Sequence, residues 1–292
     1  MPFTLPHLRS HWMIVAALLF ALMGLCVKLG AAHGFSAAEL VFYRSFIGLV
    51  VIYAIVRHRG YSLRTRHLRS HAYRGLSGFV ALLLYFYAIG GLPLATAVTL
   101  NYTSPLFLAV LATWVLKEHV SRWLLVAVVV GFVGVGLLLR PSFASDEIVP
   151  AAFGLASGFL ASVAYLNVKQ LGQAGEPDWR VVFYFTLIST VGAAVWMLAN
   201  TFHPVTWEGA AIIAGLGTSA TLAQLAMTRA YQEGQTIVVG SLAYSTVVFA
   251  SLLGVLVGDD SLGLESWLAI AIIIASGIVA TLAAPRAPLA AD

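Results

Sequence analysis

Apolar stretches separated by short polar breaks run through the whole chain, and each stretch is long enough to cross a membrane. A spanning helix needs about 20 mostly apolar residues. Ten stretches meet this requirement, at residues 12–31, 36–56, 72–90, 95–116, 122–140, 150–171, 179–200, 208–232, 236–257 and 263–283. The breaks between them carry glycine, proline or charge, as expected of turns at the membrane faces. The pattern predicts an all-α membrane protein with ten transmembrane helices.

Composition agrees with this fold class. Only 10% of the 292 residues are charged and 60% are hydrophobic, whereas a soluble domain is about 25% charged. Cys26 is the single cysteine, which excludes an intrachain disulfide. The first stretch also has features of a cleaved signal peptide, because Arg9 precedes it and Ala31 and Ala32 follow it. Its counterpart in the internal repeat described below favours a retained helix.

Lysine and arginine gather on one side of the predicted topology. If ten helices alternate in direction, this side receives Arg9, Arg57, Arg59, Arg64, Arg66, Arg69, Arg74, Lys117, Arg122, Arg180 and Arg286, whereas Arg140 lies on the other side with Lys28 near it. Such residues favour cytoplasmic loops, so both termini are predicted to be cytoplasmic. The basic run 57–74 has two interpretations: a topology determinant, which is favoured, or a contact with lipid headgroups.

The chain nearly repeats itself at half its length. Val41, Phe42 and Tyr43 recur 141 residues later as Val182, Phe183 and Tyr184. Further along the chain the offset is 142 residues, as for Tyr102 and Tyr244, and near the ends of the halves it is 144, as for Trp123 and Trp267. Single matches are common in so apolar a chain, but scattered coincidences would not drift steadily in one direction. The drift therefore indicates a true internal repeat.

Each predicted half holds five helices, an odd number. The first repeat is placed at residues 12–140 and the second at residues 150–283. Because five is odd, the second half enters the membrane from the opposite side, and the two halves form an inverted repeat around a central cavity. Many secondary transporters are built in this way, with the substrate site near the bilayer midplane where the repeats meet.

Polar and aromatic side chains interrupt several spans, most clearly at Asn101, Tyr102, Thr103, Ser104 and Pro105. Polar groups find no water in the hydrocarbon core, and proline removes a helical hydrogen bond. Such a helix is expected to face a wet pathway. The candidate substrate-binding residues are Tyr85, Asn101, Tyr102, Ser104, Tyr165, Asn167, Gln224, Tyr244 and Ser245. Together they suit a small amphipathic solute; hydrogen bonding between helices is the alternative for each of them.

Four basic residues are predicted to lie at membrane depth: Lys28, Arg44, Lys169 and Arg229. The two lysines are related by the repeat, and they either extend to the membrane interfaces or meet a substrate carboxylate. Arg44 and Arg229 either form structural ion pairs or contact the pathway. No carboxylate falls at mid-membrane, so ion coupling through a buried acid is not expected, and facilitated diffusion fits at least as well.

Other classes of function find little support. The eight histidines fall outside the spans or at their ends, without metal-ligand spacing inside a helix. No serine, histidine and acid gather at depth to form a nucleophilic site. We therefore expect no metal, no cofactor and no enzymatic activity. Basic residues do not alternate with aromatic ones along an exposed surface, so nucleic acid is not an expected partner.

Small residues four apart predict close helix packing, as at Gly154, Gly158 and Ser162. Similar glycines in the fifth helix leave two assemblies open, a monomer or a weak homodimer through the fifth or tenth helix. The expected partners are otherwise the lipid bilayer and a small-molecule substrate.

The chain resembles the drug/metabolite transporter superfamily, specifically its ten-helix exporters built from two EamA-type repeats. The resemblance covers essentially the whole chain. Its strongest part is 88–118, with Tyr102, Thr103, Pro105, Leu106 and Phe107 after a short proline turn, and Arg44, Ser45 and Phe46 are similar to the family pattern. Within the superfamily the chain is most similar to YddG-type exporters of aromatic and other neutral amino acids.

The resemblance implies export of amino acids or similar metabolites across a bacterial inner membrane by alternating access. One departure from the repeat is Val247, which occupies the position equivalent to Pro105, so the two gates are expected to move unequally. Two alternatives remain: a carrier of anionic metabolites or nucleotide sugars from the same superfamily, and a membrane enzyme or scaffold that transports nothing.

Overall fold

The computed structural model describes residues 10–91, 94–117, 121–140, 148–198, 202–256 and 263–283. In these residues all regular secondary structure is helical. The helices are α2 (Trp12–Ala32), α3 (Ala37–His58), α4 (Leu68–Gly91), α5 (Leu94–Asn101), α6 (Ser104–Val115), α7 (Arg122–Leu139), α8 (Ile148–Gln173), α9 (Asp178–Met197), α10 (Trp207–Glu233), α11 (Thr236–Ala243), α12 (Ser245–Leu256) and α13 (Leu264–Leu282).

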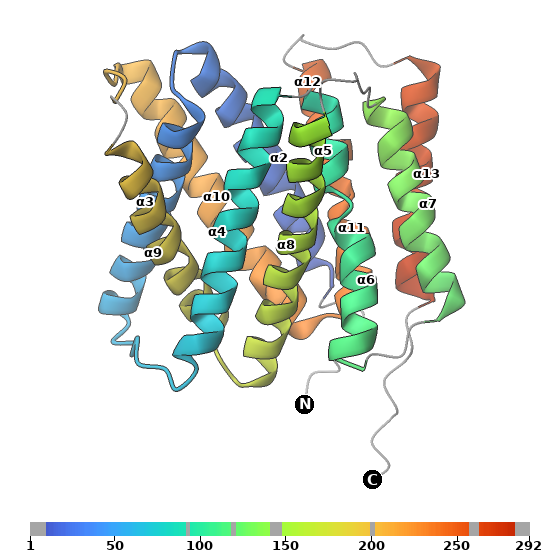
Figure 1. Cartoon of the computed structure of the whole chain (residues 1–292), viewed down its shortest axis with the longest axis horizontal. Coiled ribbons are helices and arrows are strands. Elements are labelled where there is room, and N and C mark those ends of the chain that lie inside the picture. Colours follow the sequence, from blue (N-terminus) through green and yellow to red (C-terminus); the bar gives the residue numbers. More distant parts are fainter. Residues whose placement is uncertain are drawn as a thin grey trace.

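The described helices form ten spans, because α5 continues into α6 and α11 continues into α12. Nine of these spans are long and apolar enough to cross a membrane by length and composition alone, and α4 is the tenth. Successive spans run in opposite directions, so that α2 begins and α13 ends at the same face of the bundle (Figure 1). We call this face the terminal face. The predicted fold class, an all-α membrane protein of ten helices, is confirmed. The boundaries of the two repeats, 12–140 and 150–283, remain a prediction.

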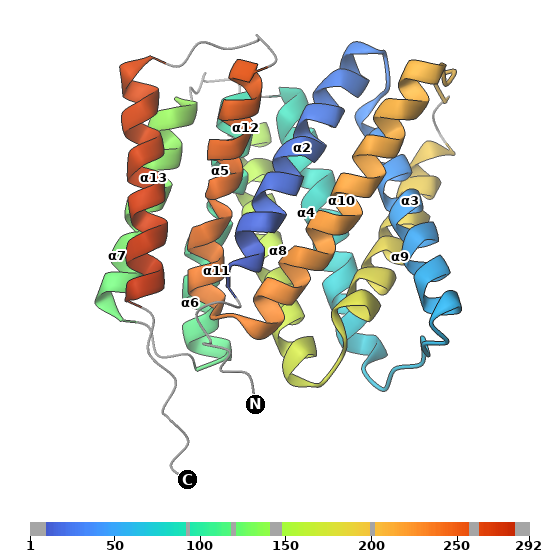
Figure 2. The same ribbon diagram turned by 180° about the vertical axis from the view of Figure 1, so that it is seen from behind.

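The helices pack as expected of an inverted repeat, in which each half makes the same contacts with the other. The third span of each half packs on the first span of the other half: α4 on α8, and α10 on α2. The contact of α10 with α2 is visible from the back of the molecule (Figure 2). The second spans, α3 and α9, pack on each other, and so do the fifth spans, α7 and α13.

Two spans are broken where the sequence pattern predicted continuous helices over 95–116 and 236–257. The first break lies at Tyr102 and Thr103, between α5 and α6, and the second lies at Tyr244, between α11 and α12. Tyr102 and Tyr244 are the pair that the repeat relates. Proline suits the first turn of a helix, where its missing N–H group costs nothing, and Pro105 stands in the first turn of α6.

The small-residue spacing in α8 serves the first break. A Cβ atom at Gly158 would lie 2.9 Å from the carbonyl oxygen of Leu100 and 3.0 Å from that of Asn101. Only a residue without a side chain therefore allows α8 to approach the backbone at the break this closely. Asn101 strengthens the same contact, because its Nδ2 donates a hydrogen bond of 3.0 Å to Oγ of Ser157.

The third span begins four residues earlier than predicted, at Leu68 instead of residue 72. The basic run 57–74 therefore divides. Its first part forms a loop, whereas His71 and Arg74 enter α4 and are buried in the protein. Arg74 was counted with the loop residues that set the topology, but it lies within a helix packed on α8 and α9, inside the bundle.

Candidate functional site

A cavity of about 230 Å³ lies in the centre of the bundle. Both halves line it, through eight of the ten spans, and none of the described residues of α7 and α13 takes part. Its lining residues are Met13, Phe20, Met23, Arg44, Arg74, Gly78, Ala81, Leu82, Tyr85, Asn101, Tyr102, Ser104, Pro105, Ala161, Ala164, Tyr165, Phe185, Gln224, Met227, Tyr231, Ala243 and Thr246.

Six of the nine polar and aromatic candidates meet in this cavity: Tyr85, Asn101, Tyr102, Ser104, Tyr165 and Gln224. The break between α5 and α6 brings Asn101, Tyr102 and Ser104 to the wall, because the chain there is not a regular helix. Gln224 is 7% exposed, and its Oε1 has no hydrogen-bond partner in the described part of the chain. Since an amide oxygen is an acceptor, Gln224 can receive a donor from a bound solute.

The other three candidates are not among the residues that line the cavity. The Nδ2 of Asn167 donates a hydrogen bond of 2.8 Å to the carbonyl oxygen of Val163 in the same helix. Tyr244 is fully buried behind the wall, with its ring centroid 6.3 Å from that of Tyr102. Ser245 begins α12 beside it. The sequence pattern did not give the direction of each of these side chains.

Of the four basic candidates, only Arg44 lines the cavity. The Nζ of Lys169 donates to carbonyl oxygens at the C-terminal end of α10, at 2.6 Å for Gly234 and 3.4 Å for Gln232. Arg229 lies near the end of α10, where it pairs with Glu233 at 3.0 Å. Lys28 lies on the exposed side of α2. These three residues do not line the central cavity.

Arg74 and Tyr231 also line the cavity, and sequence reasoning missed both. A signal for Arg74 was present, because residues 74, 78, 81 and 85 recur at helical spacing and share one face of α4. The guanidinium carbon of Arg74 lies 4.2 Å from the centre of the Phe185 ring, and its Nε has no hydrogen-bond partner among the described residues.

Aromatic rings form much of the wall. The rings of Tyr165 and Tyr231 stack, with centroids 4.8 Å apart and planes 13° apart. Tyr102 faces the same space from the broken span. Stacked rings are rigid and carry negative faces, which attract cations and pack on other aromatic groups. No acidic residue lines the cavity in the described part of the chain, so its only formal charges there are the two arginines.

Comparison with known proteins agrees with this architecture. A model of the EamA-like transporter family matches residues 10–140. The pseudopaline exporter CntI of Pseudomonas aeruginosa is 32% identical over 239 residues, which cover 81% of this chain and 82% of the relative. The chain belongs to the EamA-like transporter family. It is a transporter and not an enzyme.

Other relatives of this EamA-like transporter cover more of its length. An uncharacterized transporter of Helicobacter pylori is 30% identical over 279 residues, 93% of each chain. The riboflavin transporter of Vibrio cholerae is 26% identical over 281 residues, 93% of this chain and 92% of the relative. A solved crystal structure superposes with a TM-score of 0.84 at 24% identity, covering 94% of this chain and 99% of the other; it supports the fold alone.

At the terminal face of the transporter, a buried carboxylate joins its two halves. We call Thr65, His71, Glu176 and Arg180 the terminal-face cluster. Glu176, between α8 and α9, accepts hydrogen bonds from Oγ1 of Thr65 and from Nη1 of Arg180 at 2.9 Å, and its Oε2 lies 3.2 Å from Nε2 of His71. Burial alone would raise the pKa of Glu176, but the bonds from Thr65, Arg180 and His71 outweigh it and lower the pKa.

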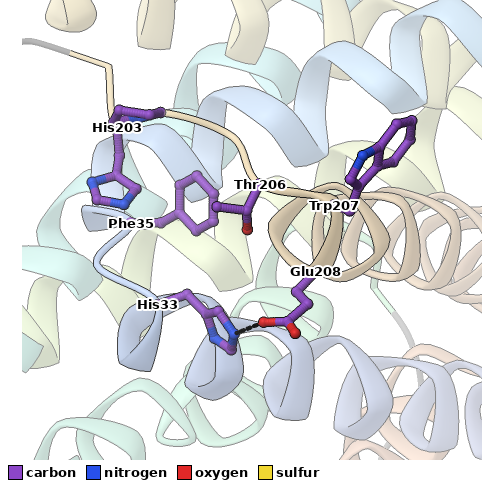
Figure 3. Close-up of a pocket in the computed structure, with 7 residues that line it drawn as sticks. His33, Phe35, His203, Thr206, Trp207 and Glu208 are labelled. Carbon is purple, nitrogen blue, oxygen red and sulfur yellow. Dashed lines mark ion pairs between the residues drawn. The ribbon is translucent and has the colours of Figure 1, made fainter.

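A second cluster, the opposite-face cluster, joins the halves at the other end of the transporter and consists of His33, Ser36, Glu39, His203 and Glu208. Glu39 accepts hydrogen bonds from the backbone N–H groups of Ser36, at 2.7 Å, and of His203. Nε2 of His33 lies 3.5 Å from a carboxylate oxygen of Glu208. Figure 3 marks this ion pair with a dashed line. A hollow of about 400 Å³ opens here, and it shares no lining residue with the central cavity.

Proposed function

We propose that this transporter exports small amphipathic metabolites, with amino acids including aromatic ones as the foremost candidates, across the bacterial inner membrane by alternating access. The observation that carries the proposal is the central cavity, which both halves line with tyrosines and neutral hydrogen-bonding groups. The name of the Pseudomonas aeruginosa relative, an exporter, supports the direction.

The size and lining of the cavity support a solute of this kind. Sites for drug-sized ligands occupy about 300–1,000 Å³, and a cavity of about 230 Å³ suits something smaller. Tyr85, Tyr102 and Tyr165 offer faces for an apolar or aromatic side chain, while Asn101 and Gln224 offer hydrogen bonds. YddG-type specificity for neutral and aromatic amino acids is part of this proposal.

Alternating access requires elements that can bend next to the site. The breaks between α5 and α6 and between α11 and α12 provide them, because neither span is a continuous hydrogen-bonded helix. No carboxylate lines the cavity in the described residues, so we expect facilitated diffusion instead of proton coupling through a buried acid. The positive-inside pattern favours a cytoplasmic terminal face.

Flux from proteoliposomes tests the proposal. Vesicles containing the purified protein and loaded with labelled L-phenylalanine or L-leucine are expected to release the label faster than protein-free vesicles. An imposed pH gradient is expected to leave the rate unchanged. Release equal to that of protein-free vesicles, for amino acids and cationic drugs alike, would contradict the transport proposal.

A carrier of small anionic metabolites is the second candidate, and the presence of both Arg44 and Arg74 at the cavity favours it over the remaining alternatives. Nucleotide sugars fit less well, because a diphosphate with a sugar and a base exceeds the volume available. Competition against labelled L-phenylalanine by neutral and by dianionic solutes separates the two candidates. Stronger competition by dianions favours the anion carrier.

A further inference from the structure

Two arginines from the first half reach the central cavity from opposite membrane faces. Arg44 lies about two turns into α3, which begins at the face away from the termini, and Arg74 lies about two turns into α4, which begins at the terminal face (Figure 1). Arg74 is 3% exposed. An arginine inside a membrane costs at least about 2.5 kcal/mol on insertion scales, so such a pair requires a reason.

No counter-charge among the residues that the structure describes supplies that reason. In the described part of the chain, neither Arg44 nor Arg74 takes part in an ion pair. The Nε of Arg74 is buried without a hydrogen-bond partner there, and no described acid lines the cavity. A buried charge without compensation is strongly destabilising, which makes an anion brought by the solute the natural partner.

The direction of the Arg74 side chain argues against a role at the interface. An arginine near the end of a membrane helix usually extends toward the headgroups. Arg74 instead extends deeper into the membrane, because its Nη1 occupies the space that a Cβ atom on Gly78 would fill, one turn further along α4. The ring of Phe185 from the second half holds the guanidinium carbon at 4.2 Å. The guanidinium is therefore directed to the cavity.

We infer that a carboxylate of the transported solute binds to Arg44 and Arg74, and that this charge pair limits the substrates to carboxylic acids and amino acids. The inference rests on the proposed transport function and gives the substrate class of the same cavity. Guanidinium groups bind carboxylates through two parallel hydrogen bonds. For an amino acid, the ammonium group meets the unpartnered Oε1 of Gln224 and the faces of the tyrosines.

Four probes with one phenyl group in common test the inference: L-phenylalanine, 3-phenylpropionate, L-phenylalaninamide and phenethylamine. Only the first two carry a carboxylate. Binding is measured by thermal stabilisation of the purified full-length protein, and flux is measured separately in proteoliposomes. The wild type is expected to bind L-phenylalanine and 3-phenylpropionate, and to bind the amide and the amine at least about 10-fold more weakly.

Two substitutions examine the arginine itself. Arg74→Gln is expected to weaken binding of both carboxylates about 10- to 100-fold, because it removes a charge-assisted hydrogen bond. Gly78→Ala is also expected to weaken binding of both carboxylates, because the added Cβ displaces the guanidinium of Arg74. Gly136→Ala is the matched control, since a Cβ there meets nothing within 4 Å. Arg122→Gln, an exposed arginine of α7, controls for charge.

The outcomes distinguish this inference from the proposed function. Carboxylate binding that depends on Arg74, without release of any amino acid, supports the carboxylate site and contradicts amino-acid export. Release of L-phenylalanine with equal binding of phenethylamine, or with unchanged binding in Arg74→Gln, overturns the carboxylate site and leaves amino-acid export standing. Failure of the wild type to bind either carboxylate also overturns the inference.

Discussion

Replacing Glu176 by glutamine removes the negative charge of the terminal-face cluster without changing the size of the side chain. The Glu176 side chain is 5% exposed. It connects the loop before α4, through Thr65, with α9, through Arg180, and so joins the two halves. Glutamine can still accept a hydrogen bond from Thr65 through its one oxygen. Its amide group would face the N–H groups of Arg180 and cannot accept from them.

The size of the effect follows from the bond that is lost. A hydrogen bond to a charged group contributes about 1.5–3 kcal/mol. Arg180 is itself only 17% exposed, so water replaces the lost partner poorly. We expect the free energy of unfolding to fall by about 2 kcal/mol, which lowers the apparent melting temperature by about 5 °C. Glu208→Gln is the matched control: its carboxylate is 84% exposed, and such pairs contribute about 0–1 kcal/mol.

The contribution of Glu176 to the stability of the folded protein decreases at low pH. The pKa of Glu176 is lowered in the folded protein, so its contribution is complete above the unfolded value, about 4.3. The contribution is lost as the pH falls through the lower folded value. The difference in melting temperature between wild type and Glu176→Gln should therefore be constant from pH 8 to pH 6, on the order of 5 °C, and should shrink below about pH 4.

Glu176→Gln should change transport less than it changes stability. The terminal-face and opposite-face clusters are both formed in one conformation, and they join the halves at the two ends of the packed pair α3 and α9. We expect this pair to act as a fixed axis, so that flux per folded molecule changes less than about two-fold. A large change in flux at an unchanged melting temperature would refute this reasoning and make Glu176 part of a gate.

The remaining predictions concern residues in or near the broken spans. Asn101→Ala and Tyr102→Ala should each lower flux without lowering the amount of protein in the membrane; equal loss of both would mean that they only hold helices together. Gly158→Ala should destabilise the protein by about 1–3 kcal/mol, because the added Cβ meets the backbone at the break. Gly24→Ala, where a Cβ meets nothing within 4 Å, should cost little in the same thermal assay. Lys169→Gln should lower the melting temperature, through lost hydrogen bonds to carbonyl oxygens at the C-terminal end of α10, and leave the substrate preference unchanged; a changed preference would return Lys169 to the pathway.

The arrangement of the spans could be predicted from sequence because it depends on hydropathy and on an internal repeat. Both signals are properties of long segments, and errors at single residues average out. The sequence carries a local signal for only one of the two breaks. Pro105 marks the break before α6, but Val247 stands at the equivalent position in α12. The break at Tyr244 follows from the repeat, since Tyr102 is its counterpart, and not from a proline near it.

The site was less predictable, because hydropathy gives depth and not direction. Asn167 and Gln224 have the same polarity and similar depth, but Asn167 bonds to its own helix whereas Gln224 faces the cavity. Arg74 was counted among the basic residues that set the topology, although it lies inside the predicted span 72–90, and it was not predicted to reach the cavity. Lys169 could not be placed, since its partners belong to the end of α10, far away in the sequence.

The two halves have the same order of spans but differ in the charges that they bring to the cavity. The residue 141 positions after Arg44 is Phe185, and the residue 142 positions after Arg74 is Leu216, so the second half contributes no equivalent cation to the cavity. Phe185 instead packs on the guanidinium of Arg74. If the solute's carboxylate binds as inferred, its charge is held by α3 and α4 alone. The second half can then move relative to a solute that stays bound to the first, and only aromatic and neutral contacts have to be exchanged between the two states. Exchanging such contacts costs less free energy than separating a buried ion pair, which is the physical advantage of confining both arginines to one half.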